Sequence, residues 1–297
     1  MPTGLETLAS WPGTRRGAGW VRADGHTESA GDVDHVLRLA SVTKVLTAMA
    51  VLVAVEEEVL ALDEPAGPPG STVRLLLCHA SGLPFEGRAP IAAPGQRRIY
   101  GNSAYELLGS LLAERTGVPY ADYVDEAVCR PLGMKATSVH GSPAADGRGS
   151  VADLLRLGQE LLAPGRVLDA QTVAEAARPQ LPDLVGVLPG FGPQRPNPWG
   201  LGFEVHGAKS PHWMPAEASP ATFGHFGQSG SFIWVDPEAG VACASLSDQP
   251  FDRWARTGWP RLGRDVLAAA TLGRTAHAPP GYVRQSPERD RRWESDT

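Results

Sequence analysis

Apolar positions are most concentrated in residues 45–55, a run of 11 residues that is apolar except for Thr47. The run follows Ser41 and Lys44 and stops at three consecutive glutamates, residues 56–58. A helix from residue 41 to about residue 60 would be apolar on every side for about three turns, which is typical of a helix buried in a core. We therefore predict the central core helix here.

Five further segments carry helical periodicity, and glycine or proline follows most of them. They are residues 73–83, 102–117, 121–134, 150–165 and 169–180. The stretch from about 65 to 185 is thus expected to be rich in helix, and the first of these helices to close at Gly82. The Pro/Gly-rich residues 186–198 are expected to form a loop.

Short runs typical of strands make up much of the rest. They occupy residues 18–40, where turns separate them, and residues 199–248, where Gly, Pro and Asp separate them. The second group predicts an antiparallel meander, and residues 253–273 predict a C-terminal helix. The order of strand, core helix, helical insertion, strands and helix indicates an α+β fold: an antiparallel sheet flanked by helices, with an inserted all-helical subdomain over about 65–185. Residues 273–297 are charged and Pro-rich, and we expect a flexible tail.

Composition excludes several classes of function. The net charge is −6 without any basic run, so a nucleic-acid partner is not expected. Three cysteines are an odd number without metal-site spacing, which favours a reducing compartment. The first 20 residues lack the pattern of a secretory signal, and the 11-residue apolar run is too short for a bilayer of roughly 30 Å. We predict a cytoplasmic protein without a membrane partner.

The first candidate for chemistry is the pair Ser41 and Lys44, in a chain that has three lysines. Residues three apart share one helix face, so the Lys44 amine would lie beside the Ser41 hydroxyl. Burial lowers a lysine pKa, and a neutral amine could take the serine proton, which arginine could not do. The alternative is an N-cap serine and a solvent-facing lysine.

A second candidate pair, Tyr100 and Asn102, precedes the helix predicted over 102–117. Tyr100 could donate or accept a proton, and Asn102 could hold a substrate carbonyl or a lysine amine. The alternative is a packed tyrosine and an N-cap asparagine.

A third candidate is His225, which glycines at 224, 227 and 230 surround. Glycines in a strand often mark close approach of the backbone to a ligand, and an N–H group there could donate to an oxyanion. The alternative is a hairpin turn with an incidental histidine.

Together these motifs resemble those of the serine β-lactamase-related family, which includes class C β-lactamases, DD-carboxypeptidases and family VIII-type esterases. Residues 41–44 (SVTK), 100–102 (YGN) and 225–227 (HFG) match its three motifs. The resemblance covers about residues 15–272, which are expected to form one serine hydrolase domain. Gly101 stands where serine is usual, and His225 where many β-lactamases have lysine.

The resemblance implies acyl transfer through a covalent intermediate. Ser41 would attack a carbonyl, Lys44 and Tyr100 would accept and donate protons, and Asn102 would orient the substrate or Lys44. The backbone N–H groups of Ser41 and Gln228 would form the oxyanion hole. No cofactor or metal is implied.

The third motif is implied to line the substrate site through His225 and Gly227. His225 would orient Tyr100 or an anionic substrate group, whereas His79 matches a position that we interpret as structural, in a helix and turn. With histidine instead of lysine, and with no export signal, a small ester or amide is the expected substrate. The alternatives are a true β-lactamase or D-amino-acid peptidase acting on a lactam or peptide, and a non-catalytic relative that binds a small molecule or protein.

Overall fold

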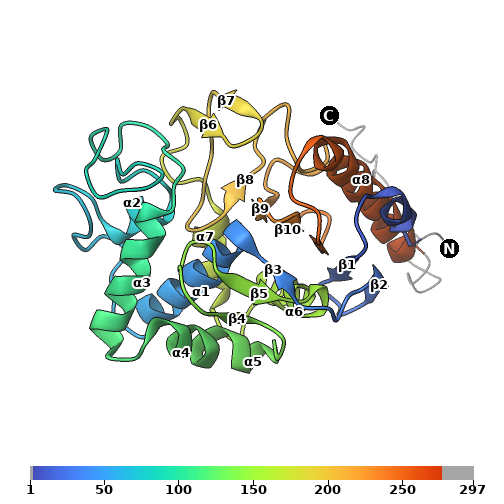
Figure 1. Cartoon of the computed structure of the whole chain (residues 1–297), viewed down its shortest axis with the longest axis horizontal. Helices are drawn as coiled ribbons and strands as arrows, with labels where there is room; N and C mark the ends of the chain where they lie inside the picture. The colour runs from blue at the N-terminus through green and yellow to red at the C-terminus, as the bar shows by residue number, and fades with distance from the viewer. Residues whose placement is uncertain (1–2, 276–297) are drawn as a thin grey trace, which may run out of the picture.

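A six-stranded antiparallel sheet lies at the centre of the computed structural model, which describes residues 3–275 (Figure 1). In sheet order its strands are β2 (Thr27–Gly31), β1 (Arg16–Arg22), β11 (Val241–Ser247), β10 (Ser231–Asp236), β9 (Phe223–Gly227) and β8 (Glu204–Val205). The expected meander is β9–β10–β11. The N-terminal strand β1 pairs along its whole length with β11, so strands from both ends of the domain belong to one sheet.

Helices cover both faces of this sheet. One face packs on α1 (Thr43–Glu56) and α6 (Val151–Leu162), and the other on η1 (Glu6–Ser10) and α8 (Arg253–Thr275). Strand β11 shows why both faces are covered. Its successive residues Ala242 and Cys243 point to opposite faces of the sheet and enter two different cores. The approach of α6 is close: a Cβ added to Gly158 would lie 2.8 Å from the Ala242 methyl.

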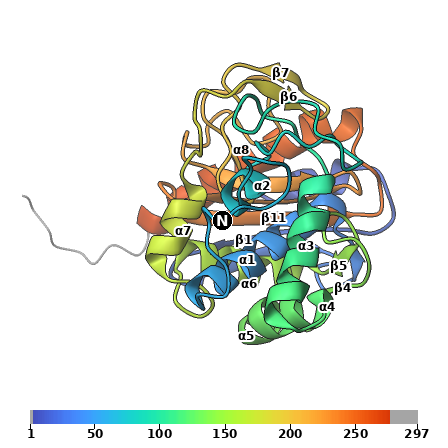
Figure 2. The same cartoon turned by 90° about the vertical axis from the view of Figure 1, so that its left-hand side faces the viewer.

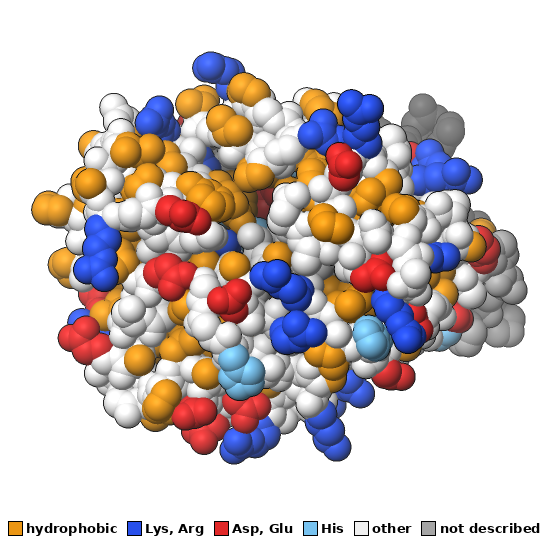
Figure 3. Space-filling view, in the orientation of Figure 1, with side chains coloured by type: hydrophobic (Ala, Val, Ile, Leu, Met, Phe, Trp, Pro, Cys, Tyr) orange, Lys and Arg blue, Asp and Glu red, His pale blue; other side chains and the backbone are white. Residues whose placement is uncertain are grey.

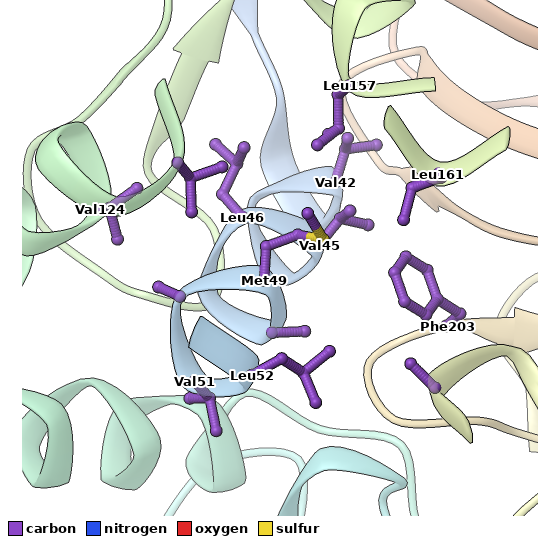
Figure 4. Packing of buried hydrophobic residues seen from close by; sticks show 14 of the residues in the cluster. Val42, Val45, Leu46, Met49, Val51, Leu52, Val124, Leu157, Leu161 and Phe203 are labelled. Atoms are coloured by element: carbon purple, nitrogen blue, oxygen red, sulfur yellow. The ribbon is translucent and has the colours of Figure 1, made fainter. Parts of the chain in front are cut away.

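The helix α1 is buried on all sides, as its composition predicts (Figure 4). A short 3₁₀ turn, η2 (Ala40–Val42), leads into it and contains Ser41. The helix ends at Glu56 rather than near residue 60, and Glu58 has a positive φ of 60°. Three adjacent carboxylates need solvent, so the chain leaves the core at that point.

The remaining helices lie mostly on the side of the molecule opposite α8. This side faces the viewer in Figure 2. They are α2 (Val73–Leu77), α3 (Ser103–Thr116), α4 (Tyr120–Val124), η3 (Asp125–Cys129), α5 (Arg130–Leu132) and α7 (Ala170–Ala177). The helix α2 ends at Leu77, not at Gly82, and His79 follows it in the left-handed region with a φ of 57°.

Two regions differ from the sequence expectation. The stretch 65–185 is not entirely helical, because β4 (Ser138–Val139) and β5 (Gly147–Gly149) pair with β3 (Leu37–Arg38), and α6 packs on the main sheet. Residues 186–198 hold a hairpin of β6 (Gly186–Leu188) and β7 (Gly192–Gln194) instead of a loop alone. Short strands between turns leave little periodicity for sequence reasoning to detect.

Two expectations concern the chain's surroundings. The cysteines Cys78, Cys129 and Cys243 are free and buried, and a cytoplasmic location stays a prediction. Among the described residues, every helix is too short or too polar to cross a bilayer. Residues 273–275 of the predicted tail belong to α8, and the rest of the tail lies outside the described residues.

Candidate active site

Ser41 lies in the turn η2 between β3 and α1, and other parts of the chain hold that turn in place. The Ser231 hydroxyl donates to the Leu39 carbonyl at 2.6 Å, and the Ser229 hydroxyl donates to the Arg38 carbonyl at 2.7 Å. Gly227 packs against the same segment, and a Cβ there would lie 2.3 Å from the Leu39 oxygen. The turn from β9 to β10 thus fixes the position of Ser41.

Lys44 is fully buried, and its amine faces the Ser41 hydroxyl. Its Nζ lies 3.4 Å from Ser41 Oγ, and it donates to Asn102 Oδ1 at 2.8 Å and to the Ala144 carbonyl at 3.0 Å. Burial lowers the Lys44 pKa to about 7, because desolvation disfavours the charged amine, while the negative charge of Glu106 opposes this. The amine is therefore part neutral at physiological pH.

Asn102 occupies the N-cap position of α3 without acting as a cap. Its side chain makes no capping hydrogen bond and instead binds Lys44. The alternative that Asn102 is only an N-cap is therefore wrong. Of its two expected contacts, the structure shows the one with the lysine amine.

Tyr100 also belongs to this cluster. Its phenol lies beside the Ser41 hydroxyl, which acts to lower the phenol pKa, and its ring lies 5.0 Å from Lys44 Nζ. Burial raises the Tyr100 pKa well above its usual range, so the phenol keeps its proton at neutral pH. Of these two groups beside Ser41, Lys44 is therefore the one that loses its proton near neutral pH and can then accept another.

His225 lies within the same aromatic group, with its ring centroid 5.8 Å from that of Tyr100 and 5.5 Å from that of Trp199. Its Nδ1 lies 2.7 Å from the Phe226 carbonyl oxygen, which can only accept, so Nδ1 carries the proton. Burial, together with the charge of Lys44, lowers the His225 pKa to about 3. A neutral His225 therefore presents an unprotonated Nε2 and no positive charge.

Two other residues from the sequence expectation lie nearby. Gln228 follows β9, and its side chain donates to the Phe251 carbonyl at 3.1 Å. His79 is buried against Tyr100, Tyr105 and Trp199 in a turn after α2. A structural role for His79 fits this packing.

Sequence reasoning gave no role to three contributors. The Ala144 carbonyl left no signal, because any residue supplies a backbone oxygen. Trp199 packs on Tyr100 and His225, and Glu106 acts on Lys44 through its charge. Glu106 is one turn after Asn102 on α3, a spacing that could have identified it.

Close packing explains why position 101 holds glycine. A Cβ at this position would lie 2.6 Å from the Pro84 carbonyl oxygen and 2.7 Å from Phe85 Cα. The Phe85 carbonyl in turn accepts from the Asn102 backbone N–H at 2.8 Å. The loop before Tyr100 thus fills the space of the serine that is usual here.

We expect Gly101→Ser to destabilise the fold by about 1–3 kcal/mol, because backbone rather than a flexible side chain must move. Thermal unfolding would measure this, with Ala93→Ser in the same loop as the control, since Ala93 is exposed. An unchanged melting temperature for Gly101→Ser would show that the loop adapts freely.

One known protein family matches most of this chain. The sequence model of the Beta-lactamase family matches residues 12–268. The chain belongs to the beta-lactamase family. Its α+β architecture is that of this family.

Individual relatives of this beta-lactamase family member differ in how much they share. A beta-lactamase from Mycobacterium bovis is 48% identical, with a TM-score of 0.89 over 91% of this chain and 100% of that one. The D-alanyl-D-alanine-carboxypeptidase/endopeptidase AmpH of Escherichia coli is 30% identical over 41% of this chain and 42% of its own. The match thus spans less than half of that curated relative.

A mutant of simvastatin synthase from Aspergillus terreus shares the fold. It is 18% identical, with a TM-score of 0.74 over 91% of this chain and 94% of that one. At that identity the likeness concerns the fold alone.

Proposed function

We propose that this beta-lactamase-family hydrolase cleaves small esters or amides through an acyl-enzyme on Ser41. One observation carries the proposal: a buried amine with a pKa of about 7 faces the Ser41 hydroxyl at 3.4 Å. Such an amine is a base at neutral pH, whereas an exposed lysine would stay protonated.

In the first step neutral Lys44 takes the Ser41 proton while Oγ bonds to the substrate carbonyl carbon. The carbonyl π electrons move onto oxygen and give a tetrahedral oxyanion. When the C–O or C–N bond to the leaving group breaks, that group takes a proton relayed from Lys44 through the Tyr100 phenol. Lys44 then takes a proton from water as the water oxygen bonds to the acyl carbon. The bond between that carbon and Oγ breaks, Oγ takes the proton from Lys44, and the carboxylic acid leaves.

We assign the oxyanion hole to the backbone N–H groups of Ser41 and Gln228. This assignment is supported by the way Gly227 and the β9–β10 turn hold the two segments against each other. Of the two roles expected for His225, its neutral state favours orienting the Tyr100 phenol over binding an anion. The missing side chain of Gly227 lets the Ser41 turn pack against β9, and the Gly227 backbone would line the substrate site.

A second candidate is a true β-lactamase or a D-amino-acid peptidase. The names of the Mycobacterium bovis and AmpH relatives favour it. Against it stands the neutral His225, which supplies no fixed cation for the carboxylate of a lactam or peptide. A small ester or amide needs no such cation.

Labelling and a substrate panel would test the proposal. A fluorophosphonate probe should add to the purified protein, and mass spectrometry should place the adduct on Ser41. Among p-nitrophenyl esters, nitrocefin and D-alanyl amides, the esters should have the highest kcat/KM. Faster nitrocefin or D-alanyl cleavage would favour the second candidate, and no adduct with any reagent would indicate a non-catalytic binding protein.

The pH dependence follows from Lys44. We expect kcat/KM for a neutral ester to rise with pH and to reach half its plateau near the Lys44 pKa of about 7, because the amine must lose its proton to act as the base. Glu106→Gln removes a charge that raises the Lys44 pKa, so the midpoint should move to lower pH. A midpoint that stays in place in the variant would contradict this coupling.

A further inference from the structure

A pocket of about 460 Å³ lies beside Tyr100, between the loop before it and the β6–β7 hairpin. Its lining includes Phe85 and Ile91 from the loop, and Val185 and Val187 from the hairpin side. Because Tyr100 lies beside Ser41 and also lines the pocket, one side chain joins the two sites. Figure 3 shows the same face of the molecule hollowed below this hairpin, with hydrophobic side chains beside the hollow.

Apolar exposure is concentrated in this pocket. Among the described residues, seven large hydrophobic side chains are exposed, and four of them line it. Those four are Phe85, Ile91, Val185 and Val187, with exposed fractions of 51, 56, 39 and 58%. Clustered exposed apolar side chains at a concave site are typical of ligand-binding surfaces.

Three arginines give the pocket its charge, and they differ in their partners. Arg98 is buried, and its guanidinium donates to the carbonyls of Cys78, Gln180, Leu181 and Asn197. Arg97 and Arg195 are exposed and have no ion pair among residues 3–275. The lining holds no Asp or Glu, so two guanidinium groups are free to bind an anion.

We propose that this pocket binds the acyl part of an amphipathic anionic substrate, an apolar chain that ends in a carboxylate. The proposal rests on the proposed function, because it places the chain beside Tyr100 when the ester carbonyl is at Ser41. Apolar side chains would cover the methylenes, and Arg97 and Arg195 would pair with the carboxylate. Arg98 would keep the loop against the hairpin, since its backbone N–H donates to the Val185 carbonyl at 2.9 Å.

A matched pair of substrates tests the charge. They are the p-nitrophenyl ester of suberic acid, which carries a free carboxylate, and the same compound with that carboxylate methylated. In the wild type kcat/KM should favour the acid, and added salt should weaken the preference. In the double variant Arg97→Gln/Arg195→Gln the ratio of the two kcat/KM values should fall by about tenfold, while the neutral ester changes less than about twofold.

Arg166→Gln is the control. Arg166 is exposed and without an ion pair among the described residues, and it lies in the loop that reaches the end of α1 opposite Ser41. An unchanged ratio in the double variant, or an equal fall in Arg166→Gln, would overturn the proposal.

The apolar part has its own test. Ile91→Ser and Val187→Ser change exposed side chains, so folding should be preserved. Both should lower kcat/KM for p-nitrophenyl octanoate several-fold relative to p-nitrophenyl acetate. If they instead change only the sedimentation coefficient, the surface would serve a second copy of the chain, and the substrate proposal would be wrong.

Failure of the proposed function would be visible separately, as no turnover of any ester by the wild type. NMR titration of the Ser41→Ala variant with octanoate and with octanamide would then still test whether the pocket binds an anionic chain. Tighter binding of octanoate that disappears in the double arginine variant supports the proposal. Equal binding of the two compounds refutes it.

Discussion

Ser41→Ala is expected to lower ester turnover by about 10³-fold or more and to abolish the fluorophosphonate adduct. The variant keeps Lys44 and Tyr100 but removes the hydroxyl that lies beside both groups. Since Ser41 is only half-buried, its melting temperature should stay close to that of the wild type.

Ser103→Ala is the matched control for that experiment. Ser103 follows Asn102 and donates to the Phe85 carbonyl at 3.3 Å, so it lies near the site without contacting Lys44. We expect it to keep most of the activity. More than a few percent of wild-type turnover in Ser41→Ala would mean that another group is the nucleophile.

Lys44→Arg should be nearly as damaging as Lys44→Met, with kcat reduced by about 10²–10⁴-fold in each. Arginine keeps a positive charge but cannot give up its proton, and methionine has no base at all. The lysine is fully buried with a pKa of about 7, so the chemistry depends on its neutral form.

The two Lys44 variants separate a base from an electrostatic partner. If Lys44 acted through its charge, Lys44→Arg would keep near-wild-type kcat, and only Lys44→Met would fail. Lys135→Arg is the surface control, since Lys135 is exposed and lies outside the site. Circular dichroism and thermal unfolding of each variant would show whether a loss comes from the chemistry or from the fold.

Much of the fold could be predicted because its signals are local. An apolar run buries itself whatever surrounds it, so the core helix α1 follows from composition alone. Alternation and turn residues likewise indicated the strands β9 to β11. The end of α1 and the β6–β7 hairpin were missed, since solvation of three glutamates and pairing of three-residue strands depend on the rest of the structure.

The candidate site divides in the same way. The sequence by itself determined that Ser41 and Lys44 lie one turn apart, because helix geometry fixes residues three apart. It also determined the order of the three motifs. Only the tertiary structure decided that Asn102 binds Lys44 instead of capping α3, that Lys44 is desolvated, and that His225 is neutral.

The physical reason is that pKa values and hydrogen-bond partners depend on segments far apart in the chain. Lys44 meets Ala144 and Asn102 only after three separate segments pack together. The pocket beside Tyr100 likewise joins Arg97 with Arg195, which lie almost 100 positions apart. No local pattern encodes such a meeting, whereas burial of a helix needs only its own residues.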